Sequence, residues 1–184
     1  MKKEIRLMAF HETGFNKYSQ KTDKKTNLVS AVFRGSHTLE DVSSSTIEVD
    51  GDDSTQKMID MVLSSKHLKQ LRYILLSSST YAGLNVVDLP LLYQKTGIPV
   101  MAVIRGKKPN SDKIKKVLTN LGMNHKLDLV DRAGPFYEDL GIYFQLAGMN
   151  QEDAINLLDL TMIEADYPEP LRITKIIANG FKLF

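Results

Sequence analysis

The pattern that decides the fold lies in residues 73–104, YILLSSSTYAGLNVVDLPLLYQKTGIPVMAVI. The runs 73–76 and 98–104 are almost continuously apolar, which is typical of strands that are buried on both faces of a sheet. Between them, the small residues at 77–83 predict a loop, and residues 85–95 predict a helix. A strand, a helix and a second strand in this order predict two neighbouring parallel strands.

Three more strands are expected before this unit. We predict them at Ile5–Phe10, at Leu28–Phe33 and in a segment that ends with Thr46–Val49. A polar loop joins the first two strands and carries Lys17, Lys21, Lys24 and Lys25. Strands that follow each other this closely favour antiparallel hairpins.

Helices and one more strand make up the rest of the predicted fold. Helical spacing of apolar residues predicts a helix from near Ser54 and a second helix that is capped near Asn110 or Ser111. The apolar residues of the second helix are Ile114, Val117, Leu118 and Leu121. A strand is expected at Gly141–Leu146, a helix from Asn150, and a last helix opened by Pro168-Glu-Pro. We therefore predict an α/β fold with a mixed β-sheet and helices on both of its faces.

Composition limits the class of protein. The chain has 184 residues, of which 42% are hydrophobic and 25% are charged, and its formal net charge is +2. These values are ordinary for one globular domain, which we expect to span residues 1–184. The longest apolar stretch, Ile98–Ile104, is too short to span a bilayer, and the first residues lack the apolar core of a signal peptide. We expect a cytoplasmic protein without a membrane partner, and the absence of cysteine excludes disulfides and thiolate-bound metals.

The charge is unevenly distributed along the chain. Residues 66–118 contain ten Lys and Arg but two Asp, which gives this segment a formal charge of +8. If these cations share one face, they form the electrostatic footprint of a nucleic-acid-binding protein. The alternative is that the lysines only solvate the surfaces of helices.

Two segments resemble a known family. Thr80-Tyr-Ala-Gly-Leu-Asn-Val-Val-Asp88 and Gly97-Ile-Pro-Val-Met-Ala-Val-Ile-Arg105 resemble the archaeal endonuclease-V-like family, also called endonuclease dU and formerly a domain of unknown function. Four shorter motifs follow the family's order: Val32-Phe-Arg-Gly35, Val49-Asp-Gly-Asp-Asp53, Arg132-Ala-Gly-Pro135 and Pro168-Glu-Pro-Leu-Arg172. The resemblance covers almost the whole chain and implies an RNase H-like mixed sheet. More distantly, it implies kinship with endonuclease V, which cuts nucleic acid near deaminated bases with Mg²⁺.

The resemblance also indicates where metal ligands would lie. Hydrolysis of a phosphodiester by a divalent ion needs several oxygen ligands that converge on the metal. Where the family has two Asp on its first strand, this chain has His11 and Glu12. Ser77 replaces an Asp at a strand end, and Lys175 replaces a His on the last helix. A neutral hydroxyl and a cation are unsuited to a divalent metal, so we expect Mg²⁺ or Mn²⁺ to bind weakly or not at all.

One acidic cluster remains as a candidate. Asp50, Asp52 and Asp53 form a metal site together with His11 and Glu12 in one interpretation. In the other, Asp and Gly residues make the turn between a strand and a helix, and Asp53 or Ser54 caps that helix. No residue is identified as catalytic.

The candidates for nucleic-acid contact lie in two loops. The loop 77–83 resembles the endonuclease V loop beside the flipped base, so Tyr81 would stack on a base and Gly83 would leave room for it. The alternative is a tight connection with Tyr81 in the core. Arg105, Lys107 and Lys108 precede a helix that bears Lys113, Lys115 and Lys116, a pattern that fits either phosphate contact or a solvated helix face.

Three functions follow from these observations. The first is a protein that binds nucleic acid at damaged or deaminated bases and cleaves it little or not at all. The second is an active Mg²⁺- or Mn²⁺-dependent endonuclease whose site is rebuilt from His11, Glu12 and residues 50–53. The third is a non-catalytic scaffold for interactions with other molecules.

Overall fold

The structure, a computed structural model, describes residues 4–15, 24–163 and 166–181. Lys17 and Lys21, which the sequence places in the first loop, lie outside these ranges. None of the helices in the described ranges combines the length and the apolar character that crossing a membrane requires.

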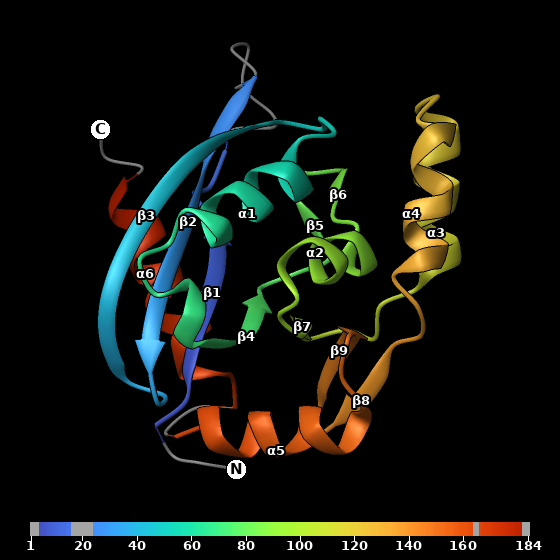
Figure 1. The fold of residues 1–184 in the computed structure, drawn as a ribbon. Helices are drawn as coiled ribbons and strands as arrows, with labels where there is room; N and C mark the ends of the chain where they lie inside the picture. Colours follow the sequence, from blue (N-terminus) through green and yellow to red (C-terminus); the bar gives the residue numbers. More distant parts are fainter. Residues whose placement is uncertain (1–3, 16–23, 164–165, 182–184) are drawn as a thin grey trace.

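A mixed sheet of seven strands forms the centre of the fold, in the order β3-β2-β1-β4-β7-β9-β8 (Figure 1). The strands are β1 Arg6–Glu12, β2 Lys25–Arg34, β3 Thr38–Glu48, β4 Leu71–Leu76, β7 Val100–Arg105, β8 Tyr137–Asp139 and β9 Ile142–Ala147. β1, β4 and β7 run parallel, whereas β2, β3, β8 and β9 are each antiparallel to their neighbours. The predicted mixed sheet is therefore confirmed.

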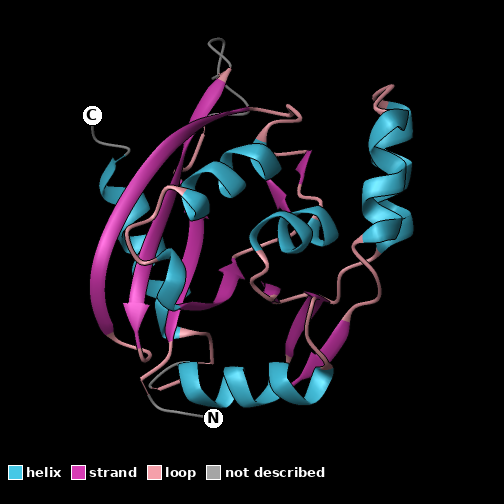
Figure 2. Cartoon of the chain, in the orientation of Figure 1, coloured by secondary structure: helices cyan, strands magenta, loops and turns pink. Residues whose placement is uncertain are grey.

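Helices cover both faces of this sheet, as predicted (Figure 2). They are α1 Ser54–Leu63, α2 Leu89–Thr96, α3 Ser111–Asn120, α4 Leu127–Arg132, α5 Gln151–Thr161 and α6 Glu169–Phe181. The first core cluster packs α1 and α2 against one face, and the second packs α5 and α6 against the other. α3 and α4 lie beside the sheet (Figure 1), over a small third cluster that contains Val86, Leu118 and Val130.

Alternation along the central strands decides which face each side chain meets. In β1, Met8 and Phe10 belong to the cluster under α1 and α2, whereas Leu7 and Ala9 belong to the cluster under α5 and α6. The alternation follows from the two-residue period of a strand. His11 follows Leu7 and Ala9 at the same two-residue spacing, so its side chain lies on the face that α5 and α6 cover.

Several predicted boundaries need correction. Residues 85–95 were predicted as a helix, but α2 begins only at Leu89, because the Asp88 carboxylate accepts a hydrogen bond from the Leu91 N–H at 3.1 Å and caps the helix. The two residues of β6, Asn85–Val86, pair instead with β5, Thr80–Tyr81, within the predicted loop. Asn110, one of the two predicted caps of α3, accepts from the Lys113 N–H at 2.9 Å.

Candidate functional site

Three parallel strands end at the edge of the sheet where the candidate site lies. Phe10 pairs with Leu76 and Leu76 with Ala102, so the ends of β1, β4 and β7 are adjacent. A pocket of about 300 Å³ opens beside these ends. It is lined by His11, Ser77, Ile104, Arg105, Tyr167, Arg172 and Lys175. The fold therefore brings together His11, Ser77 and Lys175, the three positions that we expect to depart from the family pattern, and adds Arg105 to them.

The pocket is basic. Arg105 and Lys175 are exposed at its wall, and Arg172 forms an ion pair with Glu169 at 2.5 Å. Among the described residues that line it, none carries a carboxylate. This arrangement favours an anion over a cation.

His11 is a half-buried titratable group that lines the pocket. Its Nδ1–H donates to the Glu12 carbonyl oxygen at 2.8 Å, which leaves Nε2 as the nitrogen available to a ligand. Burial lowers the pKa of His11, the hydrogen bond to Glu12 opposes this effect, and the charge of Lys175 lowers the pKa further. The ring is therefore neutral at pH 7. Burial also raises the pKa of Tyr167 to about 12, so its phenol stays protonated.

A divalent metal does not fit this pocket. Its polar side chains are a neutral imidazole, a hydroxyl, a phenol and three cations, whereas Mg²⁺ prefers carboxylate and carbonyl oxygens. In the described part of the chain, no three His, Asp or Glu side chains are grouped so that they could hold an ion.

Among the described residues, no three of the five predicted metal ligands are grouped so that they could hold an ion. Glu12 faces away from His11, and its carboxylate accepts a hydrogen bond from the Ala82 N–H. Burial raises the pKa of Glu12, and this hydrogen bond lowers it by less. Asp50 accepts from the Leu84 N–H at 2.8 Å, so Glu12 and Asp50 hold the same loop.

The other two aspartates make different contacts. Asp52 is mostly exposed, and its carboxylate lies 3.2 Å from both His125 Nε2 and Lys126 Nζ. Asp53 accepts hydrogen bonds from the Glu48 N–H at 3.1 Å and from the Asn85 Nδ2 at 2.8 Å.

The predicted turn after β3 is present, but neither of its predicted caps acts on α1. Asp53 occupies the N-cap position without a capping hydrogen bond from its side chain, and the hydroxyl of Ser54 is buried without a partner. Instead, Asn85 Oδ1 accepts from the Ser54 N–H at 3.1 Å. This cap comes from 31 residues further along the chain, so no local pattern could identify it.

Tyr81 belongs to the core. Its side chain lies in the cluster under α1 and α2, and the residue is 1% exposed. Its hydroxyl donates to the Phe10 carbonyl oxygen at 3.1 Å and accepts from the Ser77 N–H at 2.9 Å. Of the two interpretations, the structure supports the tight connection, because the ring has no open face on which a base could stack. Gly83, at a φ of +86°, packs against the Asp50 carboxylate.

Lys126 is a site residue that the sequence did not reveal. Its side chain is 1% exposed, and its ammonium donates to the carbonyl oxygens of Asp50 and Gly51, both at 2.7 Å, and of Leu84 at 2.9 Å. One buried cation thus joins the acidic turn to the 82–84 loop. A lysine at the end of a short polar segment gives no sequence signal that it is buried.

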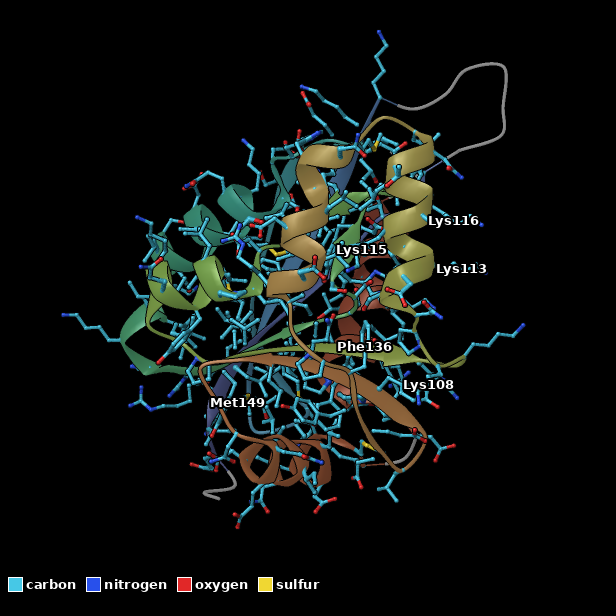
Figure 3. All side chains as sticks on the ribbon, turned by 90° about the vertical axis from the view of Figure 1, so that its right-hand side faces the viewer. Lys108, Lys113, Lys115, Lys116, Phe136 and Met149 are labelled. Carbon is cyan, nitrogen blue, oxygen red and sulfur yellow. The ribbon has the colours of Figure 1, made fainter. Side chains whose placement is uncertain are left out.

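The basic segment continues from the pocket onto α3. Lys107, Lys108, Lys113 and Lys116 are all exposed. Figure 3 shows Lys108, Lys113 and Lys116 on one side of the molecule, whereas Lys115 lies between α3 and α4. There it forms an ion pair with Asp131 at 2.5 Å.

Comparisons with known proteins agree with this fold. The Endonuclease dU family matches residues 3–182. A UPF0215 protein of Methanothermobacter thermautotrophicus is 37% identical over 188 residues, which cover 100% of this chain and 90% of the relative. The crystal structure of a protein of unknown function from Archaeoglobus fulgidus is 30% identical, with a TM-score of 0.87 over 97% of this chain and 98% of that one.

A more distant likeness identifies the architecture. Endonuclease V of Ciona intestinalis, in complex with an inosine-containing DNA, has a TM-score of 0.63 at 10% identity, over 98% of this chain and 87% of that one. At this identity the likeness concerns the fold alone, which is RNase H-like. Together, the family match over residues 3–182 and the 37% identity to a relative that is covered over 90% of its length show that this chain belongs to the Endonuclease dU family.

Proposed function

We propose that this protein binds nucleic acid through its phosphates and has little or no metal-dependent hydrolytic activity. The observation that carries the proposal is the pocket at the ends of β1, β4 and β7. Where the family resemblance implies metal ligands, this pocket has His11, Ser77 and Lys175, with Arg105 beside them. Cations and a hydroxyl at hydrogen-bonding range are the groups that contact phosphate oxygens in nucleic-acid complexes.

Damaged or deaminated bases are the proposed target. This part of the proposal rests on the likeness to endonuclease V, whose crystallised complex contains an inosine in its DNA. The pocket itself supports phosphate contact and gives no preference between bases.

The principal rival is an endonuclease with a rebuilt Mg²⁺ or Mn²⁺ site. One observation favours it: the carboxylates of Glu12 and Asp50 hold the same 82–84 loop. In that case Glu12→Gln would abolish cleavage without weakening the binding of substrate. A non-catalytic scaffold remains as the third outcome.

A paired assay separates the three functions. Single- and double-stranded DNA that carries deoxyuridine or deoxyinosine is incubated with the protein and Mg²⁺, then Mn²⁺, and the same substrates are used in gel shifts. We expect a shift without cutting, and a weaker shift for Lys175→Gln than for the control Lys95→Gln, an exposed lysine in the last turn of α2. Metal-dependent cutting that Glu12→Gln abolishes would establish the rival. Absence of any shift at low salt, where electrostatic binding is strongest, would favour the scaffold.

A further inference from the structure

We infer that a nucleic-acid strand seated in the pocket continues across α3, held through its phosphates by a second surface that consists of Lys107, Lys108, Lys113 and Lys116. We call this surface the α3 basic face. The inference rests on the proposed function, and it names a longer binding track than the pocket alone.

The four lysines are available to a ligand. Each is exposed, and within the described residues none of their side chains forms an ion pair. Lys113 and Lys116 are three residues apart on α3, so they lie on the same side of the helix, with their Cβ atoms about 5–6 Å apart. Figure 3 shows both pointing to the side of the molecule where Lys108 also lies. One acidic residue, Asp112, adjoins them in the first turn of α3.

The chain itself connects this surface to the pocket. Arg105 is the last residue of β7 and lines the pocket. Lys108 follows three residues later, a length of chain that spans at most about 10 Å. Gly106, at a φ of +103°, turns the chain between them. A strand that contacts Arg105 is therefore within reach of Lys107 and Lys108, and then of α3.

α3 is a rigid support for these side chains. Asn110 caps its first turn, and Leu118 is fully buried in the third cluster with Val86 and Val130. The helix therefore buries its opposite side against the protein and presents Lys113 and Lys116 from a backbone that is held in place. Because the lysines of the α3 basic face follow one another along the surface, they favour binding of a polyanion with evenly spaced charges over binding of a globular acidic protein.

The salt dependence of binding tests the inference. The slope of log K against log salt is negative, and its magnitude falls by about 0.9 on duplex DNA and about 0.7 on single strands for each phosphate that loses its cation. We expect the double variant Lys113→Gln, Lys116→Gln to lower this magnitude by roughly 1.4–1.8, uniformly across base sequences. Lys115→Gln is the matched control on the same helix, because its ammonium is already paired with Asp131. It should leave the slope at its wild-type value.

The outcomes distinguish this inference from the proposed function. Single-stranded DNA, RNA and duplex DNA are compared as separate arms, and circular dichroism checks that each variant is folded. If wild-type protein binds none of them, the proposed function and the inference both fail. If Lys175→Gln weakens binding while the double variant keeps the wild-type slope, the α3 basic face is excluded and the pocket remains. An equal slope for polyglutamate would also overturn the inference, because it would show no preference for phosphates.

Discussion

The buried ammonium of Lys126 donates a hydrogen bond to the carbonyl oxygen of Asp50 at 2.7 Å. The same ammonium donates to Leu84 at 2.9 Å, across the gap between two loops that are distant in sequence. The Asp50 carboxylate also accepts a hydrogen bond from the Leu84 N–H. The 82–84 loop is therefore held jointly by the carboxylates of Glu12 and Asp50 and by one cation from a third segment.

Replacement of this lysine should destabilise the protein strongly. Lys126→Met keeps much of the apolar stem but leaves three carbonyl oxygens without their donor. Because hydrogen bonds to a charged group contribute about 1.5–3 kcal/mol each, we expect the free energy of unfolding to fall by about 3 kcal/mol or more. Urea denaturation measures the loss. Lys95→Met, at an exposed position of α2, should unfold close to the wild-type midpoint; equal midpoints for both variants would contradict the bridging role.

Gly83 should tolerate no side chain. Its φ of +86° is unfavourable for other residues, and a Cβ there would collide with the Asp50 carboxylate. Gly97→Ala is the matched control, because Gly97 has a φ of +69° but nothing within 4 Å of the added Cβ. We expect Gly97→Ala to lower the free energy of unfolding by about 1–2 kcal/mol, because alanine is unfavourable in the left-handed backbone conformation. Gly83→Ala should lower the free energy of unfolding clearly more, as measured by thermal or urea unfolding. Equal losses for the two variants would show that the Asp50 carboxylate can move aside without destabilising the protein.

The sheet was predictable because its signals are local. Continuous apolar runs at 73–76 and 98–104 indicate strands buried on both faces, and these became β4 and most of β7. The short elements β5, β6 and β8 were missed, since strands of two or three residues carry too few side chains for a period to be seen. The start of α2 was misplaced although Asp88 and Pro90 gave a usable signal, a capping residue followed by a proline in the first turn.

The candidate site was predictable only where a strand period or the family resemblance fixed a position. His11 and Ser77 lie at adjacent strand ends, and Lys175 of α6 lines the same pocket. The contacts of Asn85 with Asp53 and of Lys126 with Asp50 connect segments more than 30 residues apart. Such contacts depend on tertiary packing, so no local sequence pattern predicts them.

Binding of phosphates should strengthen as the pH falls. The free protein holds the pKa of His11 below its usual value of about 6.5, chiefly by burial. A phosphate beside the ring favours the charged imidazolium, so binding takes up a proton. We therefore expect the affinity for an oligonucleotide without terminal phosphates to rise as the pH falls from about 7.5 to about 5.5. Fluorescence anisotropy at several pH values measures the change.

The variant His11→Gln supplies the control for this pH dependence. It removes the titrating ring, so its affinity should vary much less over the same range. Tyr167, with a pKa of about 12, stays neutral throughout. Without ligand, a fall in pH lowers the stability of the protein. His11 binds its proton at a higher pH in the unfolded chain than in the folded one, so this group lowers the free energy of unfolding as the pH falls below about 6.5. An affinity that is flat with pH in the wild type would refute this role.

The pocket should accept a divalent metal once one substitution adds a carboxylate and another removes a cation. In the double variant Ser77→Asp, Lys175→His, a carboxylate and a neutral imidazole join His11 at adjacent strand ends, and one cation is lost. Three such groups form a ligand set that binds Mn²⁺, whereas the wild-type set repels it. We expect Mn²⁺ binding that is detectable by electron paramagnetic resonance in the double variant but not in the wild type or in Ser77→Asn, Lys175→Gln, which has the same size without the ligands. Cleavage gained with Mn²⁺ would identify the wild-type pocket as a nuclease site that has lost its metal ligands. A folded double variant that binds no Mn²⁺ would show that the pocket was never shaped for a metal.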